Sequence, residues 1–479
     1  MTIDHYSTAA QMITALRKGE ISAKELAEMH IARIEACDDK LNAIPVRTFD
    51  RARAAAQQAD QRIEDGERAK LLGIPMTLKE STLTAGLPQT AGMVEFKDYI
   101  PSHDGQLAQK VFGAGAGLLG KTNIPVALSD WQADSPVYGR TNNPWDLTRT
   151  PGGSTGGGGA ALAAGMTPLE VGSDIGGSIR VPAAYCGVYG HRPSETAIPK
   201  GGSFPMADIP NPAVLMAVQG PLSRSAIDLE LLFDVLAGPI TGEDVGWKQA
   251  LPAARHSQLK DFRVAVVPSL LHVEPSSAMS NRLDELVQLL TKEGAKVQPA
   301  LPDIDLESYF ADYTRLLFVM NSLGAPKAVR TEMAKGNRAA GSAINDAMAD
   351  GLEMDAADFI ALLRRRESAR VAWRNFFNDW DVVIAPMVLD SAFPHQEGNQ
   401  DDRTLTIDNR SVPYYNNIAF PMLAIFPGLP STAFPAGLDS QGLPLGLQAI
   451  GPYLEDRTTL RFAQLLERAF YRFEPQPGY

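Results

Sequence analysis

The segment Gly152–Gly159 contains six glycines in eight residues, and it restricts the folds open to this chain more than any other stretch. Glycine adopts backbone conformations with positive φ and lets the main chain approach a neighbour closely. The polar residues before the cluster, Asp146–Pro151, end in proline and are not typical of a strand, whereas Ala160–Gly165 predicts an alanine-rich helix. The cluster therefore predicts a tight, closely packed loop that leads into a helix.

One interpretation of the cluster is a nucleotide-binding loop. Gly156–Ala161 matches the pattern G-x-G-x-x-A. A dinucleotide fold needs an apolar strand directly before that pattern, and none is predicted here. No lysine follows the glycines, so a phosphate-binding P-loop is excluded. The match is weak, because any run of glycines produces it.

A second interpretation is the nucleophile elbow of an α/β-hydrolase. Gly152–Gly156 matches G-x-S-x-G, with Ser154 as the nucleophile. The elbow must follow a buried strand, which the sequence does not supply, and it needs an acid and a histidine later in the chain. This interpretation stays open as the main alternative. The available histidines are His191, His256, His272 and His395.

A third interpretation combines two serine loops with a lysine. Asp174–Ser178 forms a second small glycine loop that ends in a serine before a predicted helix. Backbone N–H groups at such a position converge on an anion, as an oxyanion hole requires. Leu72–Lys79 is predicted to be a buried strand that ends in Lys79, and this lysine is a candidate base.

The pattern along the chain alternates helices and strands, which predicts an α/β fold with a mixed sheet. Ser22–Glu25 fits a capping box at the start of a helix. Residues 387–412 are polar and predict a long functional loop, and Gly120–Asn123 predicts a loop after a short strand. Further strands are predicted at 116–119, 169–173, 262–267, 295–299, 381–385, 431–436 and 445–450, and further helices at 50–66, 179–187, 276–293, most of 305–375 and 456–473.

Composition excludes several classes of protein. The net charge of −12 disfavours a nucleic-acid or anionic-membrane partner. No run of 18 uncharged apolar residues is present, so no membrane-spanning helix is expected. Cys37 and Cys186 are too few for a disulfide framework or a cysteine-rich zinc site. The opening residues lack the pattern of a signal peptide, so we expect a cytoplasmic protein.

Six ordered motifs resemble those of the amidase signature family. The two serine loops carry the most specific ones, and the resemblance extends over nearly the whole chain. The sequence departs from the usual family motif at Thr155 and Gly158, where serines are common. The motifs are Gly73–Glu80, Gly120–Pro125, Asn142–Asp146, Thr150–Gly157, Gly172–Gly187 and Gly428–Gly437.

The resemblance implies hydrolysis of a carboxylic amide, small or aryl, and also of esters or carbamates. It implies a triad in which Ser178 is the nucleophile, Ser154 is a bridging serine after a cis peptide bond, and Lys79 is the base. A lysine with a pKa of about 10.4 is a poor base near pH 7, so burial must lower its pKa. The backbone N–H groups of Ile175, Gly176, Gly177 and Ser178 would form the oxyanion hole, and no metal or organic cofactor is expected.

The resemblance also implies one amidase domain over residues 1–479, built on a mixed sheet of about ten or more strands with helices on both faces. Within it we expect N-terminal helices over 1–70, the catalytic core over 71–240, a variable substrate-side region over 241–425, and a C-terminal hairpin and helix over 426–479. Leu128, Ser129, Trp131 and Gln132 are predicted to lie near the substrate. An ion pair between Asp174 and Arg180 is expected to hold the second serine loop.

The expected partner is a small-molecule amide, with no nucleic acid and no membrane, and the chain leaves room for a homodimer. The alternative within the same family is the A subunit of a tRNA-dependent amidotransferase, which needs a partner chain. The sequence of Leu128–Asp134 differs from the sequence that is usual at this place in such amidotransferases. The acidic composition gives no sign of tRNA contact.

Overall fold

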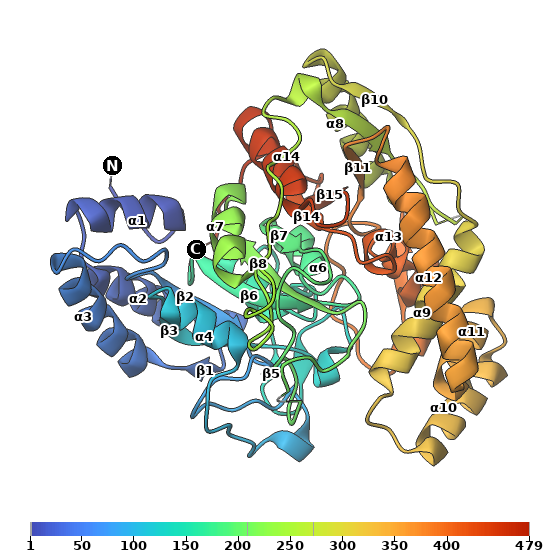
Figure 1. The fold of residues 1–479 in the computed structure, drawn as a ribbon, viewed down its shortest axis with the longest axis horizontal. Helices are drawn as coiled ribbons and strands as arrows, with labels where there is room; N and C mark the ends of the chain where they lie inside the picture. The colour runs from blue at the N-terminus through green and yellow to red at the C-terminus, as the bar shows by residue number, and fades with distance from the viewer. Residues whose placement is uncertain (1, 208, 272, 479) are drawn as a thin grey trace.

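An eleven-stranded mixed sheet runs through the centre of the molecule, and helices pack against its strands (Figure 1). The computed structural model describes residues 2–207, 209–271 and 273–478. The strands of the sheet, in spatial order, are β1 (Val46–Arg47), β3 (Gly117–Thr122), β2 (Pro75–Lys79), β6 (Leu169–Asp174), β8 (Val218–Ser223), β7 (Tyr189–Arg192), β14 (Ser431–Leu438), β15 (Pro444–Ile450), β11 (Val382–Pro386), β9 (Arg263–Val266) and β10 (Lys296–Pro299).

Two two-stranded sheets lie outside this one. They pair β4 (Asp134–Ser135) with β5 (Gly139–Arg140), and β12 (Thr404–Ile407) with β13 (Arg410–Pro413). The described residues also form fourteen α-helices, which are α1 (Ala9–Lys18), α2 (Ala23–Leu41), α3 (Phe49–Glu64), α4 (Gln106–Gly113), α5 (Gly156–Ala163), α6 (Arg180–Cys186), α7 (Ala226–Leu236), α8 (Ser277–Lys292), α9 (Leu306–Asn321), α10 (Lys327–Ala340), α11 (Ala343–Glu353), α12 (Ala356–Phe376), α13 (Met422–Ile425) and α14 (Asp456–Ala469).

The predicted α/β class with a mixed sheet is confirmed, and most predicted elements are present. The helix expected after Ser22 is α2, and its capping box is formed because Ser22 and Glu25 each bind the backbone N–H of the other. The predicted hairpin near the C-terminus is the antiparallel pair β14 and β15. Figure 1 shows α1–α3 at one end of the molecule and α9–α12 at the other.

Two elements differ from the prediction. The loop expected at Gly120–Asn123 is wrong, because β3 continues through Thr122 and pairs in parallel with β2. The polar segment 387–412 is not a plain loop, since it contains the β12–β13 hairpin and a short 3-10 helix, Gln400–Asp402. Within the part of the chain that the structure describes, no helix is long and apolar enough to cross a membrane.

The carboxyl ends of β2 and β6 place the candidate catalytic residues side by side. The two strands are parallel neighbours, with Leu78 opposite Val171, so both end at the same edge of the sheet. Apart from the half-buried Ser173, their residues are buried. Open α/β sheets bind ligands beyond the carboxyl ends of their strands.

Candidate active site

Lys79 is a fully buried lysine at the end of β2, and it contacts two serine hydroxyls. Its Nζ lies 2.6 Å from Ser154 Oγ and 2.9 Å from Ser173 Oγ. Burial lowers the pKa of Lys79 to about 7, although Asp174 and Glu170 act in the opposite direction. A lysine with this pKa is partly uncharged near neutrality and can accept a proton.

Ser154 is held in the glycine cluster, where several glycines are required by close packing. The peptide bond between Gly153 and Ser154 is cis. A Cβ on Gly157 would lie 2.3 Å from the backbone nitrogen of Asn123, and one on Gly158 would lie 2.6 Å from Glu170 Cγ. Four glycines therefore begin α5 because its first turn packs against backbone and against a buried carboxyl group. The protein itself fills this space, so the nucleotide-binding interpretation has no support.

Ser178 ends the loop that follows β6, and this loop adjoins the glycine cluster. The backbone N–H of Thr155 donates to the carbonyl of Ser178 at 3.1 Å, which ties the two serine loops together. Ser178 is 6% exposed. Within the described residues its hydroxyl has no hydrogen-bond partner. This does not argue against a catalytic role, because catalytic hydrogen bonds commonly tighten only when substrate binds.

The predicted ion pair between Asp174 and Arg180 is present and fully buried. Arg180 Nε lies 3.0 Å from Asp174 Oδ2, and Arg192 from β7 lies 3.6 Å from the same carboxylate. Burial alone would raise the pKa of Asp174, but the charges of Arg180 and Arg192 outweigh it and hold this pKa at about 2. The Asp174 carboxylate also accepts the backbone N–H groups of Gly177 and Ile179, which fixes the loop.

Arg180→Ala is expected to lower the free energy of unfolding by about 3–5 kcal/mol, because it leaves a buried carboxylate without its main partner. Urea-induced unfolding measures this loss. Arg338→Ala removes an exposed ion-pairing arginine on α10 and should leave the unfolding midpoint nearly unchanged. Equal midpoints for the two variants would contradict this role of the buried pair.

Three of the four amides predicted to form the oxyanion hole are free. No hydrogen bond within the described residues uses the backbone N–H of Ile175, Gly176 or Ser178. The structure corrects the prediction at Gly177, because its N–H donates to Asp174 Oδ1 at 3.0 Å. Gly177 has a φ of +94°, a conformation that favours glycine, and this turn points its amide back at Asp174.

The four predicted substrate-side residues lie in one segment, and Trp131 and Gln132 contact the serine loops. The indole N–H of Trp131 donates to the carbonyl of Gly176 at 2.8 Å. The backbone of Gln132 packs against Gly153. Leu128 is half-buried, and Ser129 is exposed on the outer side of the loop.

Three further residues lie beside the site, and sequence reasoning missed two of them, Ser173 and Glu170. Ser173 lies inside one of the family motifs, but nothing in the sequence distinguishes it from the residues around it. Glu170 is buried beside Lys79, accepts the Thr122 hydroxyl at 2.7 Å, and has its pKa raised to about 8 by burial. Tyr313 on α9 donates its hydroxyl to the carbonyl of Ile175 at 3.3 Å. Side chains alternate between the two faces of a strand, and only this alternation could have indicated that Glu170 lies near Lys79.

The α/β-hydrolase interpretation gains no support. The residues before Ser154 form no strand, which an elbow requires. His191 is fully buried and bonded to Thr432 and Asp456. His272 lies outside the described residues. Among the described residues, no group of three or more histidine, cysteine or acidic side chains is arranged to hold a metal ion.

Comparison with known proteins identifies the family of the chain. A family model described as Amidase matches residues 25–460. The A subunit of the glutamyl-tRNA(Gln) amidotransferase of Streptomyces avermitilis is 31% identical, and the match covers 97% of this chain and 95% of that protein. Indoleacetamide hydrolase of Bradyrhizobium diazoefficiens is 32% identical, with 96% and 86% covered. The crystal structure of a bacterial aryl acylamidase of the amidase signature family has a TM-score of 0.79 at 25% identity, with 97% and 96% covered.

The chain belongs to the amidase family. The family and fold class expected from the sequence are therefore confirmed, as is the enzyme class, an amidase that acts on C–N amide bonds.

Proposed function

We propose that this chain hydrolyses a small or aryl carboxylic amide through an acyl-enzyme on Ser178. The observation that carries the proposal is the hydrogen bond of 2.6 Å between the buried amine of Lys79 and the hydroxyl of Ser154. A buried lysine with a pKa of about 7 supplies a base at the working pH.

The proposed reaction begins when Ser178 Oγ attacks the amide carbon. Its proton passes to Ser154 Oγ, while Ser154 gives its own proton to the uncharged Lys79. The amides of Ile175, Gly176 and Ser178 stabilise the oxyanion that forms. The proton then returns through Ser154 to the leaving amine, the C–N bond breaks, and water hydrolyses the ester on Ser178 by the same relay.

Adduct mapping tests the nucleophile. A fluorophosphonate is expected to label Ser178, because it traps activated serine hydroxyls. Peptide mass spectrometry locates the label. A label on Ser154 would support the α/β-hydrolase alternative and contradict the proposed roles.

The substrate class is tested on the purified chain without partners, with a panel of anilides, aliphatic amides, esters and carbamates. We expect turnover of at least one aryl or small aliphatic amide. The relative named as part of an amidotransferase keeps a second function open. Inactivity of the chain alone, together with normal fluorophosphonate labelling of Ser178, would favour a component of a larger enzyme that needs a partner.

A further inference from the structure

One loop touches both serine loops of the site. We call residues 128–134 the bridging loop. A Cβ on Gly153 would lie 2.2 Å from the carbonyl oxygen of Asp130 and 2.4 Å from that of Gln132, so the backbone of the loop packs directly against the residue before Ser154. On the other side, the indole of Trp131 donates to the carbonyl of Gly176 at 2.8 Å. A shift of this loop would therefore displace the backbone next to both Ser154 and the loop that ends in Ser178.

The peptide plane between Gly176 and Gly177 is held at both of its polar ends. Trp131 binds its carbonyl oxygen, and Asp174 accepts its N–H at 3.0 Å. Rotation of this plane would change the backbone angles of both glycines and turn the neighbouring amides of Gly176 and Ser178. These amides are two of the three free donors of the proposed oxyanion hole.

The backbone has an unfavourable conformation at the first residue of the bridging loop and at the residue before it. Ala127 and Leu128, which are not glycines, have φ values of +52° and +59°. Consecutive residues with side chains rarely adopt this left-handed region, so contacts from outside must stabilise the loop.

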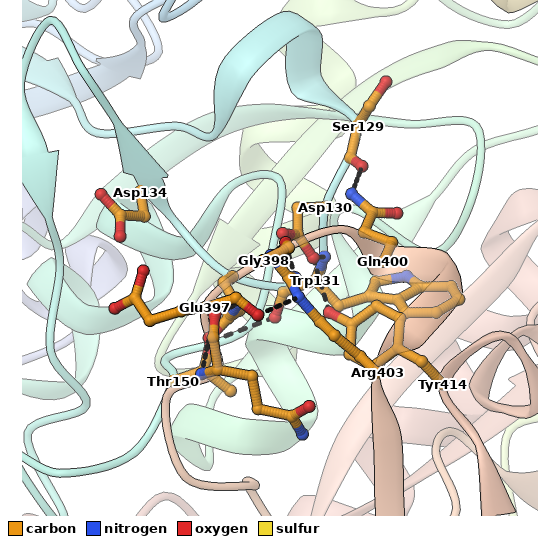
Figure 2. Close-up of polar contacts among 12 residues, drawn as sticks. Ser129, Asp130, Trp131, Asp134, Thr150, Glu397, Gly398, Gln400, Arg403 and Tyr414 are labelled. Carbon is orange, nitrogen blue, oxygen red and sulfur yellow. Dashed lines mark hydrogen bonds and ion pairs between the residues drawn. The ribbon is translucent and has the colours of Figure 1, made fainter.

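Several of those contacts come from residues 396–403, which we call the polar strap, and from Tyr414 beyond it (Figure 2). Arg403 Nη1 lies 2.6 Å from Asp130 Oδ2, and its Nη2 donates to the carbonyl of Gly398 at 2.7 Å. The hydroxyl of Tyr414 donates to Asp130 Oδ1 at 2.5 Å. The side chains of Arg403 and Asp130 are 11% and 13% exposed, so solvent screens their attraction little.

Two further contacts of the polar strap lie on either side of this ion pair. The side chain of Gln132 makes two hydrogen bonds with the backbone of Gln396, each 2.9 Å long: its Nε2 donates to the carbonyl, and its Oε1 accepts the N–H. Figure 2 shows Gln400 facing Ser129, whose carbonyl it binds. The strap is therefore bonded to three positions of the bridging loop.

The connection from the strap to the site runs through Asp130. Its carboxylate binds Arg403 and also accepts the backbone N–H of Trp131 at 2.7 Å. Trp131 packs against Tyr414, with 5.1 Å between the ring centroids. Loss of the Arg403 guanidinium would leave Asp130 with only the Tyr414 hydroxyl and local backbone, which would weaken the support of the Trp131 backbone and thereby of its indole.

We propose that Arg403, Asp130 and Trp131 are positioning residues that fix the oxyanion amides, and that the polar strap is the part of the segment 387–412 that serves this purpose. The proposal rests on the proposed function. It assigns the strap an effect on the transition state rather than on substrate binding.

The test compares Arg403→Ala, Arg403→Lys and Trp131→Phe, the last of which removes the indole N–H and the smaller ring of the indole but keeps an aromatic side chain. Because small displacements of catalytic groups reduce rates strongly, kcat for an anilide should fall about 10- to 100-fold in Arg403→Ala, with KM changed less than about twofold. Trp131→Phe should lower kcat about tenfold, and Arg403→Lys should recover part of the loss. The matched control is Arg410→Ala, which removes an exposed arginine from the neighbouring β13 and should keep the wild-type kcat.

Three outcomes would overturn the proposal: a wild-type kcat in Trp131→Phe, a rise in KM at unchanged kcat in Arg403→Ala, or an equal loss of kcat in Arg410→Ala. If Arg403→Ala does not fold, Trp131→Phe and Arg403→Lys still decide the question. A wild-type chain without amidase activity would instead refute the proposed function, so the two failures are distinguishable.

Discussion

Ser178→Ala is expected to lower kcat about 10⁴-fold or more, because it removes the attacking atom of the proposed reaction. The free energy of unfolding should change by less than about 0.5 kcal/mol, since the Ser178 hydroxyl has no partner among the described residues to leave unsatisfied. Steady-state kinetics with an anilide and urea-induced unfolding measure the two effects.

The control is Ser368→Ala, which removes an exposed serine hydroxyl on α12. It should keep wild-type turnover and fluorophosphonate labelling, whereas Ser178→Ala should lose both. Turnover within tenfold of wild type in Ser178→Ala would rule out Ser178 as the nucleophile.

Lys79→Met is expected to lower kcat/KM about 10²- to 10⁴-fold, the usual contribution of a general base. Methionine keeps much of the volume and leaves no buried charge, so the fold should be retained. The wild-type enzyme should show a matching pH dependence. Because the pKa of Lys79 is about 7, the amine is protonated below that pH and cannot accept a proton.

The kcat/KM of the wild type for an uncharged amide should therefore fall about tenfold for each pH unit below about 7 and level off above it. A profile of kcat/KM measured from pH 5 to 9 tests whether activity falls in this direction. Activity that stays constant down to pH 5, or that rises as the pH falls, would exclude an uncharged Lys79 as the base.

The strands around the site could be predicted because short apolar segments of the sequence indicate that they are buried. Leu72–Lys79 and Leu169–Ser173 are short and mostly apolar, and they correspond to β2 and β6. Strand β7 could not be predicted, since His191 and Arg192 look like surface residues. Both are fully buried, and their partners lie on other elements, Asp456 at the start of α14 and Asp174 at the end of β6. The expected division into a core and a variable region stays a prediction.

The residues of the candidate site were predictable from motifs, but their connections were not. Glycine loops that contain serines indicate that the backbone packs closely against other residues, but they do not indicate which residues these are. The neighbours are Asn123, Glu170 and the bridging loop. The role proposed for the segment 387–412 could not be predicted, because no pattern in the sequence indicates that residues of this segment bind Ser129, Asp130 and Gln132.

By itself, the sequence determined the family, the α/β class and the candidate reactive groups, since these depend on residue type and on local periodicity. Tertiary structure alone decided how basic Lys79 is, because its pKa depends on how completely water is excluded around the amine. It also decided which amides stay free, because the Asp174 carboxylate, which Arg180 and Arg192 hold in place, accepts the N–H of Gly177. Desolvation and hydrogen-bond partnership depend on residues far apart in the chain, so only the folded molecule sets them.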